Sequence, residues 1–535
     1  ASGKCRLRND VMAEQLAVTE VASVKEKPPP PPPQSSSDGA TRAFGAMALF
    51  TAAKAAYDKV DPLDAAAREA LHQKYAAKAV TLARKQGGVY VKAAQQIASL
   101  QGGSGGGGVP PAYTTALAEL TDRAAPQDLR LFEAMIAEEL CVPGWTVDAP
   151  SGSGLAAVRC PAIAAASLSQ VHRASAEDGR ELALKLQFPW LAEQVPTDFA
   201  VFKMVAGQMQ PGGFDVSWLV DDLQKHVTSE LDFLTEARHA GEAAAALAPR
   251  GESVLVPAVR IATRRLLATE WVEGLLRVDD AAGLAAAGIC RRAAGRLVAD
   301  VLLGEMPLRH GLVHGDPHSG NVYLRRPAAA SGIPEQLVLL DHGLYHHPPA
   351  QLRLAVCRLV LACARPWVSS ERVRACAEPL ANELWPLLPL LLSPAFALGT
   401  GLSLSDLGEA AVGRIPPSVG YEAVWRALVA IHDGDGQSLL GLLHSLGYVR
   451  GLLNSLGTPE RERVAALATH AAAALAEAGE TAPSRPLALL RVHALFWVLA
   501  AARFAAAAAS LATARLAVAV ALAAVVAAVA VAAHA

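Results

Sequence analysis

The feature that most constrains this chain is a pair of acidic motifs near its middle, each beside a short apolar run. Asp316 and Asn321 lie five residues apart within the run 311–324, and Asp341 directly follows the apolar run 337–340. The apolar runs predict short strands, so the acids lie at strand edges. Asp-x-x-x-x-Asn followed by Asp-x-Gly is typical of kinase-like phosphoryl-transfer sites. We therefore expect such a site here.

Length and charge narrow the alternatives. With 535 residues the chain is too long for one ordinary core, so a catalytic unit with helical additions is expected. Its 48 Lys and Arg residues against 50 acids leave no concentrated basic face, so no nucleic-acid partner is predicted. The seven cysteines are scattered and never spaced Cys-x-x-Cys, which indicates small apolar side chains in a reducing compartment.

The N-terminal part divides at proline and glycine runs. Residues 1–40 contain six consecutive prolines at 28–33 and are predicted to be a disordered, Pro-rich leader. Ordered structure is expected to begin near Thr41, with a helical pattern to about Leu100 that breaks at Pro62. The glycine-rich run 102–108 has no preceding strand and is predicted to be a flexible loop, not a phosphate cradle.

A strand period appears further along the chain. The apolar positions that alternate are Leu182, Leu184 and Leu186. They predict a strand that carries Lys185 in its middle. Asp178-Gly179 predicts a hairpin turn before it, because both central positions of such turns favour positive φ. A small-residue turn at 164–167 precedes the hairpin, so the order matches the start of a nucleotide-binding lobe.

Several later elements are predicted from periodicity. One helix is expected from 218 to about 248, strands over 254–259 and 266–272, and one helix over 281–308. Beyond 348 the pattern is helical.

The chain ends in an Ala/Val-rich tail. Residues 516–533 are eighteen positions without a charge, just within the length that a membrane span needs. Alanine is only weakly apolar, so a helix packed on the protein is the alternative.

Lys185 requires an anionic partner if it is buried, because an unpaired buried charge is costly. Glu236, on the following helix, is the expected partner, and the pair would hold the phosphates of a nucleotide. Taken singly, each side chain is more simply explained as a solvated surface residue. The order of lysine, glutamate and the two acidic motifs favours the functional interpretation.

In the acidic motifs, Asp316 is predicted to orient or deprotonate the acceptor. Asn321 and Asp341 are predicted to coordinate Mg²⁺, which prefers oxygen ligands. His314 and His318 flank Asp316 in a His-x-Asp-x-His pattern. Without a further ligand cluster we interpret His314 as a hydrogen-bonding support of the loop and not as a zinc ligand.

Taken together, these motifs resemble the UbiB/aarF-domain family of atypical kinase-like proteins across roughly residues 75–350. Lys92 and Gln95 stand where the family has its Lys-x-Gly-Gln motif, and Ala164, Ala165, Ala166 and Ser167 form its Ala-rich loop. Lys185 corresponds to its nucleotide lysine, and Glu230 and Asp232 to its Glu-x-Asp motif. Glu236, the loop His314–Asn321 and the triplet 341–343 complete the set.

The resemblance implies an α+β, two-lobed protein-kinase-like fold with an N-terminal helical extension and a long helical C-terminal region. The expected units are 1–40 (leader), 41–125 (helical extension), 126–275 (N-lobe), 276–365 (C-lobe core), 366–500 (helical region) and 501–535 (hydrophobic tail). It also implies ATP or ADP and Mg²⁺ as ligands, with Lys185 and the Ala-rich loop at the nucleotide. Lys92, Gln95, Glu230 and Asp232 would regulate access, with Lys92 paired to Glu230 over the site.

Three positions depart from the family pattern. Ala94 replaces the glycine of the Lys-x-Gly-Gln motif, Ser169 a glycine after the Ala-rich loop, and Ser319 a proline in the catalytic loop. The extra methyl of Ala94 is expected to shift its helix slightly.

The details around Trp218, Leu231 and Leu340 look most like the mitochondrial aarF branch linked to lipid homeostasis. This implies a mitochondrial protein associated with the inner membrane, with a plastid as the alternative, and a role in organellar lipid or quinone homeostasis. Two other functions remain open: a pseudokinase scaffold without turnover, and a small-molecule phosphotransferase of the choline or aminoglycoside kind.

Overall fold

A computed structural model describes most of the chain. The described residues are 37–61, 63–99, 110–120, 124, 126–150, 152–208, 217–327, 332–382, 385–397 and 437–510. The proline run, the glycine-rich run and the tail at 516–533 lie outside these residues.

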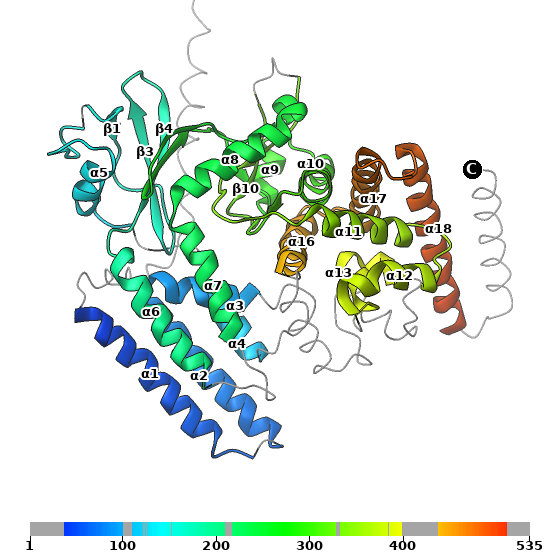
Figure 1. Cartoon of the computed structure of the whole chain (residues 1–535), viewed down its shortest axis with the longest axis horizontal. Coiled ribbons are helices and arrows are strands. Elements are labelled where there is room, and N and C mark those ends of the chain that lie inside the picture. Colours follow the sequence, from blue (N-terminus) through cyan, green and yellow to red (C-terminus); the bar gives the residue numbers. More distant parts are fainter. Residues whose placement is uncertain are drawn as a thin grey trace, which may run out of the picture.

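The N-terminal extension is built from four helices in the described residues. They are α1 (Ser37–Tyr57), α2 (Ala65–Gln86), α3 (Gly88–Ser99) and α4 (Pro111–Leu117). α1 begins four residues before Thr41, where we expected order to start. α1 and α2 lie side by side as a long pair below the rest of the molecule (Figure 1). Asp64 accepts a hydrogen bond from the Ala67 N–H and so fixes the start of α2 after the turn.

The N-lobe contains an antiparallel sheet with six strands in the described residues. Its strands are β1 (Leu155–Val158), β2 (Ala164–Ala165), β3 (Ser169–Ala176), β4 (Glu181–Gln187), β6 (Val259–Ala262) and β7 (Leu266–Glu270). The order is β1-β3-β4-β7-β6, with β2 paired to β3. The predicted alternation in β4 is confirmed, because Leu182, Leu184 and Leu186 are all buried. The hairpin turn is also present, but only Gly179 has a positive φ, of 83°.

Helices pack around this sheet and below it. They are η1 (Leu129–Phe132), α5 (Glu133–Glu139), α6 (Leu191–Ala206), α7 (Ser217–Glu230) and α8 (Phe233–Leu247). The prediction of one helix over 218–248 was wrong, since the chain breaks between α7 and α8. Asp232 is extended there, and its carboxylate caps α8 by accepting from the Leu234 N–H.

The C-lobe begins with short elements. They are η3 (Ala248–Ser253), β5 (Val254–Leu255), β8 (Leu276–Arg277), α9 (Ala281–Ala286), α10 (Arg291–Val298) and the π-helix η4 (Ala299–His310). Two predictions need correction. The strand over 254–259 is interrupted before Pro257, which has no N–H for a sheet. The helix over 281–308 is interrupted at Gly288, whose φ is +70°.

The acidic motifs lie on two small sheets of the C-lobe. The strands are β9 (Val313–His314), β10 (Val322–Arg325), β11 (Gln336–Leu339) and β12 (Tyr345–His346). β10 and β11 form an antiparallel pair between β8 and β5, and β9 pairs with β12. The predicted strands beside Asp316 and Asp341 are therefore present, and each acid follows the end of a strand.

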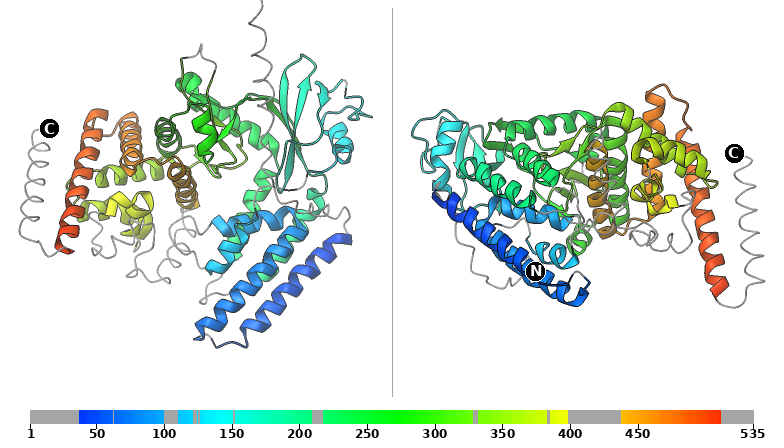
Figure 2. Two further views of the ribbon diagram at one scale, coloured as in Figure 1. Left: turned by 180° about the vertical axis from the view of Figure 1, so that it is seen from behind. Right: turned by 60° about the horizontal axis from the view of Figure 1, so that its bottom comes forward.

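The C-terminal region is helical. Its described elements are α11 (Ala350–Cys363), α12 (Ser370–Ala381), α13 (Leu387–Leu392), η7 (Pro394–Ala397), α16 (Gln437–Ser455), α17 (Glu460–Glu477) and α18 (Arg485–Ser510). α17 packs against η4, α11 and α18. In both further views α18 lies at the end of the molecule opposite α1 and α2 (Figure 2). None of the described helices has the length and apolarity to cross a membrane.

The molecule is thus an α+β protein with two lobes, a helical N-terminal extension and a long helical C-terminal region, which confirms the expected fold class. Separate apolar clusters fill the extension, the N-lobe and the C-lobe, and the C-lobe cluster continues into α11, α16 and α17. The boundaries proposed at residues 125, 275, 365 and 500 remain predictions.

Candidate active site between the two lobes

A lysine bridges two carboxylates where the lobes meet. The Lys185 Nζ, on β4, lies 2.8 Å from both carboxylate oxygens of Glu236 on α8. The same Nζ lies 2.8 Å from the Asp341 Oδ2 in the C-lobe. It also lies 5.1 Å from the ring centroid of Phe233. The contact expected between Lys185 and Glu236 is therefore present, and Asp341 joins it.

Local structure brings these side chains together. β4 lies between β3 and β7, with Lys185 opposite Val171 and Leu267, so its backbone is held in the interior of the sheet. The cap at Asp232 starts α8 so that Glu236 is in its first turn and only 3 % exposed. The Gly343 N–H donates to the Asp341 Oδ1 at 3.0 Å and orients that carboxylate.

Burial and pairing set the charges. Burial would lower the pKa of Lys185, but Asp341 and Glu236 hold it above its ordinary value. Burial would raise the pKa of Asp341, but Lys185 and the Gly343 N–H bring it well below its usual range. Burial raises the pKa of Glu236 to about 7 although Lys185 opposes this. Lys185 and Asp341 are therefore charged at neutral pH.

The loop that carries Asp316 is ordered by its own polar groups. The Asp316 N–H donates to the His314 Nδ1 at 3.2 Å, and the Asn321 Nδ2 donates to the Asp316 carbonyl at 3.0 Å. Burial lowers the pKa of His314 to about 4, so its ring is neutral and Nδ1 accepts. The expectation that His314 supports the loop by hydrogen bonding is confirmed. His318 lies nearby, with its Nε2 3.7 Å from the Asp316 Oδ2.

The N-terminal extension reaches this loop through α3. The Lys92 Nζ lies 2.8 Å from the Glu230 Oε1 on α7 and 3.6 Å from the Asp316 Oδ2. Burial would raise the pKa of Asp316, but the charges of Lys92 and His318 hold it below its ordinary value. Asp316 is therefore a weak base that is suited to orienting a hydroxyl group.

The two ion clusters adjoin at Gly343. A Cβ built on this glycine would lie 3.3 Å from the Asp341 Oδ1, 3.5 Å from the Glu230 Cγ and 3.9 Å from the Glu236 Oε2. Three of the predicted side chains, those of Glu230, Glu236 and Asp341, thus meet around one glycine. The backbone amide of this glycine holds Asp341, and the absence of a side chain keeps the clusters adjacent.

The remaining predicted residues have clear positions. The Gln95 Nε2 donates to the Leu120 carbonyl at 3.2 Å, which ties α3 to the end of the α4 segment. Asp232 is the cap of α8: its carboxylate accepts hydrogen bonds from the Leu234 N–H and from the Thr235 hydroxyl. Ala94 is 4 % exposed and packs in the core of the extension with Tyr90 and Leu117. Its methyl group is accommodated in that core.

The Ala-rich loop is a tight turn between β2 and β3. Ala164 and Ala165 form β2, which pairs with Val171 and Gln170. The Ala166 N–H donates to the Ser169 carbonyl at 2.8 Å and closes the turn around Ser167. Because Val171 is also opposite Lys185, the loop is two strands away from the lysine in the same sheet.

The donor set fits a divalent cation. The four carboxyls against two ammonium groups leave a surplus of negative charge, and Asn321 and Asp341 offer oxygen atoms, which Mg²⁺ prefers. No group of three or more His, Cys, Asp and Glu with metal-binding geometry occurs in the described ranges. Magnesium sites that complete their coordination with phosphate and water do not need one.

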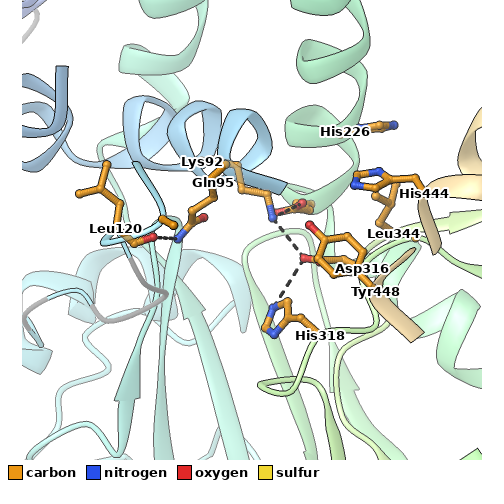
Figure 3. Close-up of a pocket in the computed structure, with 13 residues that line it drawn as sticks. Lys92, Gln95, Leu120, His226, Asp316, His318, Leu344, His444 and Tyr448 are labelled. Carbon is orange, nitrogen blue, oxygen red and sulfur yellow. Dashed lines mark hydrogen bonds and ion pairs between the residues drawn. The ribbon is translucent and has the colours of Figure 1, made fainter. Parts of the chain in front are cut away.

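A cavity of about 300 Å³ lies beside Asp316, which forms part of its lining (Figure 3). Sequence reasoning identified Lys92, Gln95, Glu230, Asp316 and His318 among its lining residues. It missed three polar residues on helices: His226 on α7, and His444 and Tyr448 on α16. No motif marks them, and α16 begins more than a hundred residues after Asp316, so only the tertiary fold reveals them.

A strand lysine paired with a helix glutamate, facing an Asp-x-x-x-x-Asn loop across two lobes, is the arrangement of kinase-like proteins. This chain is a protein of that class. Residues 147–368 match the sequence model of the ABC1 atypical kinase-like domain. The matched region belongs to the UbiB/aarF family of atypical kinase-like proteins, as its motifs predicted.

Curated relatives agree with this assignment. A probable serine/threonine-protein kinase, abkD, of Dictyostelium discoideum is 27 % identical over 416 residues, which cover 76 % of this chain and 56 % of the relative. AarF domain-containing protein kinase 1 of Gallus gallus is 36 % identical over 238 residues, covering 43 % of this chain and 44 % of the relative. The chain therefore spans about half the length of these two relatives.

Among solved structures, a complex of Rv3197 with erythromycin from Mycobacterium tuberculosis matches with a TM-score of 0.41 and 20 % identity. The match covers 73 % of this chain and 97 % of the solved one.

Proposed function

We propose that this chain binds a magnesium nucleotide, ATP or ADP, between its lobes and either hydrolyses it or transfers its terminal phosphoryl group to a small or lipid-related molecule. The observation that carries the proposal is the Lys185 ammonium group, held at 2.8 Å from both Glu236 and Asp341. Kinase-like sites use such a lysine for the nucleotide phosphates and such an aspartate for the metal.

Each residue has a role in this proposal. Glu236 holds Lys185 in place for the phosphates, and the Ala164–Ser167 turn, two strands away in the same sheet, would contact the nucleotide. Asn321 and Asp341 would hold Mg²⁺, which neutralises phosphate charge when it is bound. Asp316 orients the hydroxyl group or water that attacks. Lys92, paired with Glu230, lies 3.6 Å from the Asp316 carboxylate, so α3 would restrict how an acceptor reaches Asp316.

The setting is also part of the proposal. The likeness of the family motifs to the mitochondrial aarF branch supports a mitochondrial protein with a role in lipid or quinone homeostasis, associated with the inner membrane. The proposed membrane association would involve residues 516–533, which lie outside the described ranges. Fractionation of cells that express the tagged protein tests this setting.

Thermal unfolding with Mg-ADP tests nucleotide binding. Wild-type protein should be stabilised by about 2.7 kcal/mol at a ligand concentration 100 times Kd, with a higher unfolding midpoint. Asp341→Asn should abolish that shift, because the metal loses its carboxylate. Asp221→Asn, on the exposed face of α7, should keep it. An identical midpoint for wild-type protein with and without Mg-ADP would show the proposal to be wrong.

Turnover needs a separate assay. Hydrolysis of ATP should be measured with and without lipid vesicles, and Asp316→Asn should reduce it at least a hundredfold if Asp316 orients the attacking group. Stabilisation by Mg-ADP without any hydrolysis or transfer would indicate a nucleotide-binding scaffold instead.

A further inference from the structure

The cavity beside Asp316 is distinct from the part of the site that would hold the nucleotide. Lys185, Glu236, Asn321 and Asp341 do not line it. It shares Asp316 with the catalytic loop, and its opposite wall comes from α16 (Figure 3). α16 lies outside the residues 147–368 that match the family model. Asp316 therefore has one side toward the metal-binding residues and another toward a pocket with its own wall.

The size of the cavity restricts its ligand. A volume of about 300 Å³ lies at the lower end of the range of small-molecule sites. A folded protein segment needs a long groove, whereas this volume suits a compact molecule. The described walls come from α3, the segment after α4, α7, the catalytic loop, Leu344 and α16.

The charges of the lining argue against an anionic ligand. Among the described lining residues the one ammonium group is that of Lys92, which contacts Glu230 at 2.8 Å and Asp316 at 3.6 Å. Two carboxylates against one ammonium group would repel a phosphate or carboxylate. A quaternary ammonium ligand normally requires a cage of aromatic rings. In the part of the chain that the structure describes, Tyr448 is the one tyrosine, tryptophan or phenylalanine that lines this cavity.

The other polar side chains can both donate and accept hydrogen bonds. These are the amide of Gln95, the imidazoles of His226, His318 and His444, and the phenol of Tyr448. His444 and Tyr448 lie one helical turn apart on α16, with ring centroids 5.0 Å apart. In Figure 3 the Tyr448 ring lies beside Asp316, and His444 lies between Tyr448 and His226. Hydroxyl groups, which also donate and accept, complement this set.

We infer that this cavity is the acceptor site and that it takes a small, neutral, polyhydroxylated molecule. The inference rests on the proposed function and specifies its acceptor. One hydroxyl oxygen of the acceptor, oriented by Asp316, attacks the γ-phosphorus of ATP. The new O–P bond forms as the bond from that phosphorus to the β–γ bridging oxygen breaks, and ADP leaves with the electron pair. The hydroxyl proton passes to Asp316 and then to water. His444 and Tyr448 determine specificity by binding the other hydroxyl groups.

Two measurements separate this inference from the proposed function. Saturation-transfer NMR on the full chain without nucleotide detects binding of myo-inositol, D-glucose and glycerol, with choline and glycerol 3-phosphate as comparisons. At least one of the three polyols should bind, and the affinity should fall about tenfold in His444→Ala and in Tyr448→Phe, as expected for one lost hydrogen bond. His493→Ala, on the exposed face of α18, is the matched control and should bind as wild type does.

Transfer is then followed by ³¹P NMR with ATP and the bound polyol. A phosphate monoester of that polyol should appear, and His444→Ala and Tyr448→Phe should raise KM about tenfold with a much smaller change in kcat. Both variants should keep the Mg-ADP thermal shift, which shows that they are folded. No binding by any of the three polyols, equal affinity in wild type and variants, or binding of choline or glycerol 3-phosphate alone overturns the inference. Loss of the Mg-ADP shift in wild-type protein contradicts only the proposed function, because the polyol measurement needs no nucleotide.

Discussion

At Gly315, between His314 and Asp316, the catalytic loop approaches the strand β12 so closely that a side chain has no space. A Cβ at this position would lie 2.7 Å from the Leu344 Cδ2 and 3.1 Å from the His346 Nε2. The φ of this glycine is not positive, so the requirement is one of space. Close contact here fixes the backbone that places the Asp316 carboxylate between Lys92 and His318.

Gly315→Ala should therefore destabilise the protein by about 1–3 kcal/mol through overpacking, and it should lower turnover more than nucleotide binding. Chemical denaturation and the Mg-ADP thermal shift measure the two effects. The matched control is Gly451→Ala on α16, where a Cβ meets no atom within 4 Å. It should stabilise the protein by about 0.5–1 kcal/mol, as alanine does in an exposed helix. Equal effects of the two substitutions would contradict the steric explanation.

At the scale of elements, the π-helix η4 is joined to α17 by a polar network. The Asp300 carboxylate lies 2.7 Å from the His470 Nε2 on α17 and 2.6 Å from the Arg250 Nη2 on η3. Arg250 also pairs with Glu305, one turn further along η4. Burial would raise the pKa of Asp300, but the hydrogen bond and charge of His470 and the charge of Arg250 lower it to about 2. Ionised Asp300 thus helps to hold η4 against α17.

This pKa gives a predicted acid sensitivity. The folded pKa of about 2 lies below the value of about 3.9 for an unfolded chain, so the stabilisation is full above pH 4 and is lost as the pH falls toward 2. The shift corresponds to at most about 2.6 kcal/mol. Asp300→Asn should lower the free energy of unfolding at pH 6 and flatten its decline between pH 4 and 2. Asp58→Asn, at an exposed surface pair, should change stability at pH 6 by less than about 0.5 kcal/mol. An unchanged acid slope in Asp300→Asn would contradict this role.

Strand β4 and the break between α7 and α8 show which parts of the fold could be predicted from the sequence. Strand β4 was predictable because alternate leucines are buried on one face. The break between α7 and α8 was not predictable, because the apolar stripe in the sequence continues through Leu231 to Leu234. In the fold Leu223 and Val227 are buried, whereas Leu234 is 49 % exposed. The cap formed by Asp232 outweighs the periodicity, and this local hydrogen bond reorients Glu236 toward Lys185.

In the candidate site, too, some residues could be predicted from the sequence and others could not. Lys185, Glu236, Asp316 and Asp341 have fixed neighbours in the sequence pattern, so their convergence was predictable. His226, His444 and Tyr448 have none, because their position depends on how the C-terminal helices pack against the catalytic loop. The break in the helix at Gly288 and the break in the strand before Pro257 were not predicted. Both result from local backbone requirements that periodicity alone does not reveal.

At the scale of the whole molecule, a buried ion pair attaches the N-terminal extension to the N-lobe. The Arg42 guanidinium on α1 bonds both oxygens of Asp198 on α6, at 3.0 and 2.6 Å. Its Nη1 donates to the Gln86 carbonyl at the end of α2, and its Cζ lies 5.3 Å from the ring centroid of Tyr90 on α3. Arg42 and Asp198 are each 1 % exposed. One side chain therefore joins α1, α2, α3 and α6.

Arg42→Met should leave Asp198 buried without a partner and cost about 3–5 kcal/mol in the docking of α1. Hydrogen exchange should then accelerate in α1 and α2, with little change in β4 and η4. Arg42→Met combined with Asp198→Leu should restore much of the protection, because no unpaired charge remains. A single variant with wild-type exchange in α1, or a double variant that is worse than the single one, would contradict this assignment.

The cavity beside Asp316 also has a consequence for the order in which a growing chain acquires its functions. Its walls come from α3, α7, the catalytic loop and α16, so residues from 92 to 448 must be present before it closes. On a ribosome, Lys185 and Glu236 emerge first, and even Asp341 emerges about a hundred residues before Tyr448. A nascent chain would thus be able to assemble the lysine and its carboxylates well before the pocket for an acceptor exists. Phosphoryl transfer would begin only after the C-terminal helices have been translated and have docked.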